Sequence, residues 1–460
     1  MKKVWIFALA VATAMVACKK APSVVNPAEP ELPVDTEVDD DAAPAAIRFG
    51  SNLSKVETKA GVDEWEEHEL YIYAFEADKD GNFAYDASAY IDNVMALAPT
   101  SGTQGKIDVY DENAKDINGN PIEDGFYYYK DGTPVGGSVR DFLYEFYGYY
   151  VGNEGEYATE DGDAPVPAYD GEKEAVTLDI VIDGTQDIML AKADKEFDIE
   201  DQDVYKKDSP TELIDATRAY SAYSARRGLV PNLVFNHQLS RFQFQIKEGD
   251  PNAENVMIES ISLYSKTGAT LIIAPTPGLE VDEEGEDTEL ILKDANGDLL
   301  PTLQGSEGSW SWPTRQQIAG GETAPIRPTN TYETVGESIM AMPGNAEYKM
   351  IVKTVLLKKN EEYATSAAGT DVEFTPLQRF EAEYAVDLSE TTYSPDTYGS
   401  TLTNSFVDEA FNTKWSGKAA PGFQYTVRLT VYGPEEIKIN VTLNPWLDYE
   451  DEIDIDPDED

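Results

Sequence analysis

The chain has 460 residues, and its 35 Lys and Arg against 87 Asp and Glu give a formal net charge of −52 at pH 7. Such a surface repels phosphate backbones, which argues against a nucleic-acid partner. Apolar residues make up 41% of the chain and aromatic residues 11%, so the acidity covers a globular body and does not indicate disorder throughout. The length suggests two domains.

Residues 1–17 have the pattern of a secretory signal peptide. Lys2 and Lys3 supply a positive start, and the apolar run 4–14 that follows is too short to span a bilayer as a mature helix. No later stretch is apolar for long enough to cross a bilayer. We therefore expect the chain to be exported.

Cys18 is the only cysteine in the chain. It cannot form an internal disulfide, and without a second thiol there is no redox or zinc spacing. The stretch Met15-Val16-Ala17-Cys18 resembles the lipobox of bacterial lipoproteins, in which the signal is cut before a cysteine that then carries fatty acid such as palmitate. The alternative is a buried or free cysteine. Acylation at Cys18 predicts a lipid anchor in the outer membrane.

Residues 18–45 are rich in Pro, Ala and acidic residues and show no apolar periodicity. A Pro-rich chain that repels itself is extended and semi-rigid, so we interpret this segment as a tether or propeptide. From Ile47 onward, short apolar runs alternate with Asp-Gly and Asn-Gly turn signals. This pattern predicts a mostly β body made of antiparallel sheets.

Three stretches indicate how the strands are used. The runs "YIYAF" at 71–75 and "FLYEFYGYY" at 142–150 predict aromatic strands inside a sandwich, the second apolar on both faces. In "LVFNHQLSRFQFQI" at 233–246 the apolar residues change from odd to even positions. Because strand side chains alternate between faces, this change predicts a bulge or short turn near Ser240 and Arg241.

The clearest hairpin lies near the C-terminus. Two alternating runs flank the turn "GPEE", with apolar residues at Tyr425, Val427, Leu429 and Val431 and then at Ile437, Ile439, Val441 and Leu443. The same odd phase continues into the tail 447–460 at Leu447, Tyr449, Ile453 and Ile455, while acids fill most of the intervening positions. The composition favours a solvated acidic tail, and the alternation favours a strand, so both interpretations stay open.

Residues that carry catalytic chemistry are scarce. The chain has only two histidines, His68 and His237, and its one cysteine is assigned to lipid. Soft-metal sites and Ser-His-Asp or Cys-His catalysis therefore lack material. His237 is expected to be a strand-end residue, and "DKDGN" at 78–82 lacks the spacing of a calcium loop. We predict no enzyme activity, no catalytic or metal site and no cofactor.

Several stretches, in this order, resemble landmarks of the fimbrillin-like proteins of Bacteroidales, the type V pilins. Besides the lipobox they are "IRF" at 47–49, "ETKAG" at 57–61, "DIMLA" at 187–191, "LVFNHQLSRFQFQI" at 233–246, "IMAMPG" at 339–344 and "PGFQYTVRLTVYGPEEIKINVTLNPW" at 421–446. The resemblance implies two transthyretin-like antiparallel β-sandwich domains in series. We place them at 46–275 and 276–446, the first ending after the strand "IESISLY" at 258–264.

The resemblance also implies a function. Proteins of this family are subunits of cell-surface fimbriae, cut by a trypsin-like protease near the first strand so that a strand of a neighbouring subunit fills the groove. Arg48 matches the cleavage position best, with Lys55 and Lys59 as further candidates. The candidate donor strand is the tail with Leu447, Tyr449, Ile453 and Ile455. The partners implied are other fimbrial subunits, the outer membrane through the lipid, and a ligand on a host or bacterial surface.

Other roles remain open at this stage. A stalk subunit donates and accepts a strand, an anchor keeps its lipid, and a tip subunit accepts without donating. A different class is a monomeric surface lipoprotein that binds glycan or a host ligand through aromatic residues exposed in loops. Trp310 and Trp312 in "GSWSWP" are the candidates, because a Trp pair between glycine and proline can stack on sugar rings. Packing of this pair against a neighbouring domain is the equal alternative.

Overall fold

The computed structural model describes most of the chain between residues 45 and 445. The described residues are 45–47, 49–50, 68–77, 82–86, 89–97, 106–109, 126–128, 130–135, 138–141, 143–193, 205–206, 209–213, 220–225, 231, 233, 235–250, 256–282, 284–293, 304–306, 309–312, 328–359, 372–393 and 409–445. Residues 1–44 and 446–460 lie outside these ranges.

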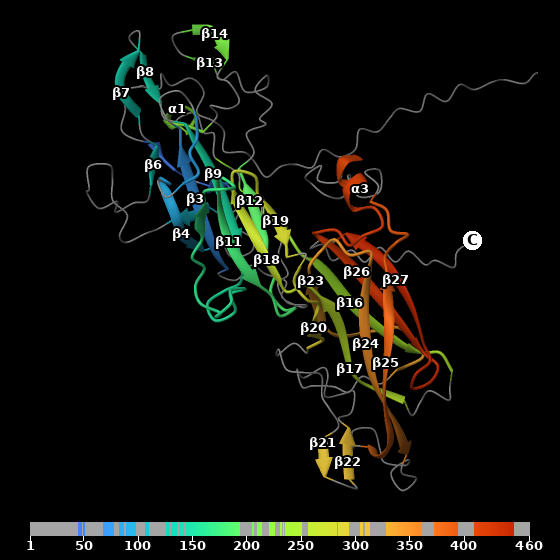
Figure 1. The fold of residues 1–460 in the computed structure, drawn as a ribbon. Helices are drawn as coiled ribbons and strands as arrows, with labels where there is room; N and C mark the ends of the chain where they lie inside the picture. The colour runs from blue at the N-terminus through green and yellow to red at the C-terminus, as the bar shows by residue number, and fades with distance from the viewer. Residues whose placement is uncertain are drawn as a thin grey trace, which may run out of the picture. The chain divides into compact units, whose positions relative to one another are not determined.

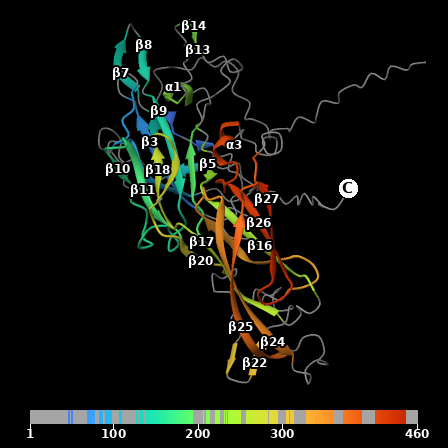
Figure 2. The same cartoon turned by 45° about the vertical axis from the view of Figure 1, so that its right-hand side comes forward.

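Two sheets built mainly from the first half of the chain pack face to face and form the first sandwich (Figure 1). The larger has the order β15-β12-β9-β3-β4-β5-β2 and the smaller the order β10-β11-β18-β19; Figure 2 shows β10, β11 and β18 side by side. Their bounds are β2 Phe49–Gly50, β3 Glu69–Glu76, β4 Ile91–Leu97, β5 Lys106–Val109, β9 Tyr144–Tyr150, β10 Ala168–Asp170, β11 Ala175–Val181, β12 Met189–Lys192, β15 Asn236–His237, β18 Gly268–Ala274 and β19 Gly278–Val281.

A second pair of sheets, built mainly from later residues, forms the second sandwich. One has the order β23-β16-β26-β27 and the other the order β20-β17-β24-β25-β22-β21. Their bounds are β16 Ser240–Glu248, β17 Val256–Ser265, β20 Thr288–Ile291, β21 Gln304–Ser306, β22 Ser309–Trp312, β23 Glu333–Ala341, β24 Glu347–Lys359, β25 Val372–Asp387, β26 Phe423–Val431 and β27 Ile437–Pro445.

Three small ladders and two short helices complete the described structure. The ladders pair β1 (Ala45–Ala46) with β6 (Tyr127–Tyr128), β7 (Lys130–Val135) with β8 (Ser138–Asp141), and β13 (Tyr205–Lys206) with β14 (Ser209–Leu213); the helices are α1 (Ala222–Ala225) and α3 (Glu409–Trp415). The mostly β, antiparallel fold class is confirmed. The one parallel pair among the described strands joins β16 to β26.

The apolar residues between 233 and 246 move from odd to even positions because the chain changes from one sheet to another there. β15 pairs with β12, whereas β16 pairs with β23 and β26 in another sheet. Between them Gln238 and Leu239 belong to no strand, and the Gln238 N–H donates to the Ile188 carbonyl at 2.8 Å. The break thus lies immediately before Ser240, because the chain crosses from one sandwich to the other.

The strands do not divide between the sandwiches at one point in the chain. β16 and β17 lie within the expected N-terminal range 46–275, yet they pair with β26 and β24 of the second sandwich. The chain then returns to the first sandwich, where β18 pairs with β11 and β19 with β18. The strand at 258–264 was expected in the N-terminal sandwich, but it pairs within the second sandwich. The domain boundary at residue 275 stays a prediction.

The seven-stranded sheet is buried on both faces. On β9 the side chains of Tyr147 and Tyr149 belong to the cluster between the two sheets, together with Leu178 of β11 and Leu271 of β18. The alternate side chains of β9 belong to a second cluster on the opposite face, which includes Phe146. All seven residues of β9 are buried, which confirms the strand at 142–150 that was expected to be apolar on both faces.

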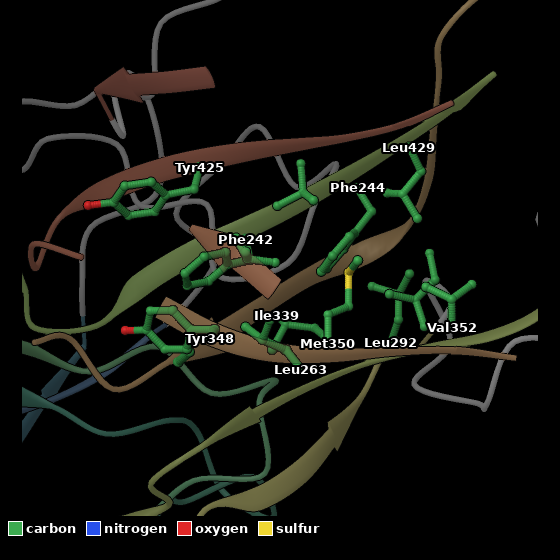
Figure 3. Close-up of a cluster of buried hydrophobic side chains, with 14 of the residues drawn as sticks. Phe242, Phe244, Leu263, Leu292, Ile339, Tyr348, Met350, Val352, Tyr425 and Leu429 are labelled. Carbon is green, nitrogen blue, oxygen red and sulfur yellow. The ribbon is translucent and has the colours of Figure 1, made fainter. Parts of the chain in front are cut away.

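The second sandwich has a single core between its two sheets (Figure 3). Phe242 of β16 stacks on Tyr425 of β26 with ring centroids 5.1 Å apart, and Tyr348 of β24 approaches Phe242 from the other sheet at 4.9 Å. The expected C-terminal hairpin is confirmed. Its alternating residues meet directly across β26 and β27, as Tyr425↔Leu443, Val427↔Val441, Leu429↔Ile439 and Val431↔Ile437.

Candidate functional site

The segment around the predicted cleavage position is built into the first sandwich. Ala45 and Ala46 form β1 against β6, and the Ile47 N–H donates to the Phe126 carbonyl at 2.8 Å. On the other side of position 48, Phe49 begins β2, pairs with Ile107 of β5 and is only 1% exposed. The residues flanking Arg48 on both sides are therefore held by the body of the protein.

Phe49 helps to cover the second face of the seven-stranded sheet. Its ring meets Phe146 of β9 edge-on, with centroids 5.2 Å apart and an interplanar angle of 85°. Tyr128 of β6 and Tyr220 contact the same Phe146 ring at 6.0 Å and 5.7 Å. The side chains packed on this face thus come from short segments far apart in sequence.

The predicted site residues themselves lie outside the described part of the chain. They are Cys18, Arg48, Lys55 and Lys59 on the N-terminal side, and Leu447, Tyr449, Ile453 and Ile455 in the tail. The structure describes the two flanks of Arg48 and the strand β27, which ends at Pro445 two residues before the tail. The roles of all eight residues stay predictions.

A buried carboxylate in the first sandwich was not expected from the sequence. Glu145 of β9 is 8% exposed, and its Oε2 accepts hydrogen bonds from Tyr147 at 2.7 Å and from Tyr85 at 2.5 Å. Burial and the neighbouring Glu145 raise the pKa of both tyrosines, so both remain neutral donors at physiological pH. The network satisfies a charge that would otherwise be costly to bury, and we assign it a structural role.

His237 lies at the end of β15, the strand end where it was expected. Its Nδ1 is 2.8 Å from Oδ2 of Asp187, and both residues are buried. Asp187 immediately precedes Ile188, whose carbonyl accepts the Gln238 N–H. The pair thus stabilises the point where the chain leaves the sheet.

Trp310 and Trp312 lie in a strand and not in a loop, contrary to the expectation. Both belong to β22, where Trp310 pairs with Phe374 and Trp312 with Val372 of β25. The glycine and proline around "SWSW" were interpreted as loop signals, but they flank a short strand instead.

Two features are absent from the described ranges. No group of three or more His, Cys, Asp and Glu side chains there could hold a metal ion. None of the helices described is long and apolar enough to cross a membrane.

No protein-family model and no curated protein matches the chain. Similar solved structures include a fimbrial protein from Bacteroides vulgatus, at 11% sequence identity and a TM-score of 0.42, covering 87% of this chain and 99% of that chain. Another, from Bacteroides uniformis and described as a cell adhesion protein, has 13% identity and a TM-score of 0.38, covering 88% of this chain and 99% of that chain.

A third similar structure is the tip fimbrial protein Mfa3 from Porphyromonas gingivalis, with 9% identity and a TM-score of 0.27, covering 87% of this chain and 99% of that chain. These solved structures are described as fimbrial or cell adhesion proteins.

Proposed function

We propose that the chain is a subunit of a cell-surface fimbria, exported as an outer-membrane lipoprotein through Cys18. A trypsin-like protease cuts the precursor after Arg48, and the tail of one copy then serves as donor strand for the next. The role is structural or adhesive, and its partners are further fimbrial subunits. The resemblance of the sequence to fimbrillin-like proteins suggests this sequence of events, and the chain's own packing supports it.

One observation carries the proposal. The second face of the seven-stranded sheet is buried, and the segment that covers part of it runs through the predicted cleavage position. Ile47 packs against this cluster from the N-terminal side of Arg48, and Phe49 belongs to it on the C-terminal side. A cut after Arg48 would therefore separate β1 and Ile47 from the body while Phe49 stays attached to it.

Loss of β1 and Ile47 would uncover part of an aromatic surface. β6 would lose its only ladder partner among the described strands, and Tyr128, now 1% exposed, would be bared on that side. Unpaired backbone groups and exposed apolar surface favour association until another chain supplies hydrogen bonds and covers the surface, which is the physical basis of strand addition. The uncovered face would thus favour a donor strand.

The tail has the pattern of such a strand. Leu447, Tyr449, Ile453 and Ile455 alternate with acidic residues, so one face of an extended tail would be apolar and the other charged. Each large apolar side chain buried in a groove stabilises the complex by about 1.5 to 3 kcal/mol. Several such side chains together are enough to hold a fibre.

The test is assembly of the precursor without its signal peptide, residues 19–460, after trypsin treatment. We expect electron microscopy to show fibres for the wild type, and none for the same protein with residues 447–460 deleted. Uncleaved precursor is the matched control and should form none. Fibres from the tail-deleted protein would contradict strand donation by the tail.

The same experiment separates a stalk subunit from a monomeric binder, whereas the tip and anchor roles predict behaviour toward another subunit and toward the membrane. A monomeric lipoprotein that binds glycan or a host ligand would stay monomeric after cleavage, with or without its tail. A tip subunit would cap fibres of another subunit without extending them, because it accepts a strand and donates none. An anchor subunit would keep its lipid and end the fibre at the membrane.

A further inference from the structure

β27 is an edge strand with unusual regularity. It pairs with β26 over all nine of its residues without a register shift, and it is the last strand in the order β23-β16-β26-β27. An edge of this length presents a row of backbone N–H and C=O groups to any strand that approaches.

The other described sheet edges are shorter or interrupted. β2 and β15 have two residues each, β10 and β21 have three, and β19 and β20 have four. β23 is nine residues long, but its pairing with β16 is interrupted near Gly336, which has a φ of +63°. Short strands and bulges are two of the devices by which proteins prevent edge pairing, and β27 has neither. Proline is another such device, but Pro445 stands at the last position of β27 and leaves the rest of the edge unaffected.

Charged side chains, which oppose the pairing of edge strands, are also few at this edge. Lys438 is the only charged residue in β27. Between residues 423 and 445 the acids Glu435 and Glu436 lie in the turn and balance the bases Arg428 and Lys438, so the hairpin has no net charge in a chain of −52. A second copy approaching this hairpin meets less repulsion than the chain's net charge would suggest.

The two rows of side chains on β27 suit pairing with an identical strand. Ile439, Val441 and Leu443 face the core but are only partly buried, whereas Lys438 and the polar residues Asn440 and Thr442 are exposed. An incoming strand with the same alternation would extend the core row on one face and leave polar residues on the other.

We propose that β27 pairs antiparallel with β27 of a second copy of this chain, about a twofold axis at Val441. This register brings all nine residues of both strands into the pairing and keeps the faces matched, because each residue meets one of the same parity. Val441 then lies opposite its own copy, Ile439 opposite Leu443, and Asn440 opposite Thr442. Lys438 does not meet its own copy, so no like charges are directly opposed.

This contact is separate from the strand donation proposed above. It needs neither cleavage nor the tail, so it links precursors before maturation and would link matured subunits side by side. The two proposals can therefore fail independently: fibres without β27 pairing, or paired precursors that never form fibres.

The first test is the sedimentation of residues 19–460, uncleaved, over a range of concentrations at physiological ionic strength. We expect a monomer–dimer equilibrium for the wild type and for the same chain without residues 447–460. Asn440→Lys with Thr442→Lys should remain monomeric, because each new lysine would lie opposite the other across the axis. The control Val181→Lys with Thr288→Lys adds the same charge at two exposed positions elsewhere and should dimerise like the wild type.

A second test fixes the register by cross-linking. Residues 19–460 contain no cysteine, so Val441→Cys introduces a single thiol that would face its copy about 4.5 to 5.5 Å away between Cα atoms, within disulfide range. Lys438→Cys would place the two thiols of the dimer six residues apart along the strands, about 20 Å, which is too far for a disulfide. An equal mixture of Asn440→Cys and Thr442→Cys changes only exposed positions, and we expect it to cross-link as a heterodimer.

Three results would overturn the proposal. The first is a wild-type precursor that stays monomeric at every concentration. The second is cross-linking that is as strong from Lys438→Cys as from Val441→Cys. The third is a dimer that disappears when residues 447–460 are deleted, because the tail of the second copy, and not its β27, would then occupy the edge.

Discussion

Replacement of Phe49 by Ala tests whether the cover over the second face controls access to the cleavage position. The side chain is 1% exposed and its ring lies against Phe146. Truncation of a buried Phe to Ala costs about 3 to 5 kcal/mol. β2 has only two residues, so a segment this small can open while the rest of the sandwich stays folded, and the cost appears in that local opening.

The expected result is faster cleavage after Arg48. Where opening and closing are fast compared with cutting, the rate follows the population of the open form. Weakening the closed form by about 3 kcal/mol raises that population roughly a hundredfold, since each 1.4 kcal/mol is a factor of ten. Phe49→Ala should therefore increase the initial rate of tryptic cleavage at the 48–49 bond by about two orders of magnitude, as measured by mass spectrometry.

Two controls make this result specific. Arg48→Gln combined with Phe49→Ala should abolish the product that begins at residue 49. Val166→Ala truncates a side chain that is 81% exposed, so it should leave the cleavage rate unchanged. A Phe49→Ala protein cut at the wild-type rate would refute the idea that docking of this segment protects the bond.

Three further predictions follow from the same account. Burial raises the pKa of Glu76, and the hydrogen bond that Tyr144 donates at 2.8 Å offsets only part of this effect. The folded state therefore binds the Glu76 proton more tightly than the unfolded state does. This contribution to the stability of the wild type is lost as pH rises through the raised pKa. Urea unfolding should show Glu76→Gln gaining stability relative to the wild type between about pH 4.5 and pH 7, and an unchanged difference would contradict it. Cys18→Ala should take up no radiolabelled fatty acid, whereas equal labelling of both proteins would remove the lipid anchor. Ile453→Asp with Ile455→Asp should block fibre formation, because buried carboxylates would be unpaired, while the melting temperature of the monomer barely moves; fibres of normal length would count against the donor strand.

The sequence predicted the elements whose signal is local. The hairpin of β26 and β27 alternates with period two on both sides of its turn, and its pairs meet as expected. The burial of β9 on both faces was evident because apolar and aromatic side chains occupy nearly every position. Such patterns report the surroundings of a strand, since each face must match what it packs against.

The sequence could not predict which strands share a sheet. β16 alternates as any half-buried strand does, and nothing in its residues indicates a parallel partner in β26, 183 residues later. The buried Glu145 was missed for the same reason, because its partner Tyr85 is distant in the chain. At the candidate site, the resemblance predicts cleavage at Arg48, but the packing of the flanking residues depends on Phe126 and Phe146, which only the fold brings there.

Binding of the tail to a cleaved acceptor is the most direct test of the central claim. The acceptor is the precursor without residues 447–460, before and after trypsin cleavage at Arg48, and the ligand is a labelled peptide of residues 447–456 followed by fluorescence anisotropy. We expect saturable binding only after cleavage, and none for the peptide carrying Ile453→Asp and Ile455→Asp. Equal binding before and after cleavage, or no binding to either form, would contradict assembly by strand donation into a site that cleavage opens.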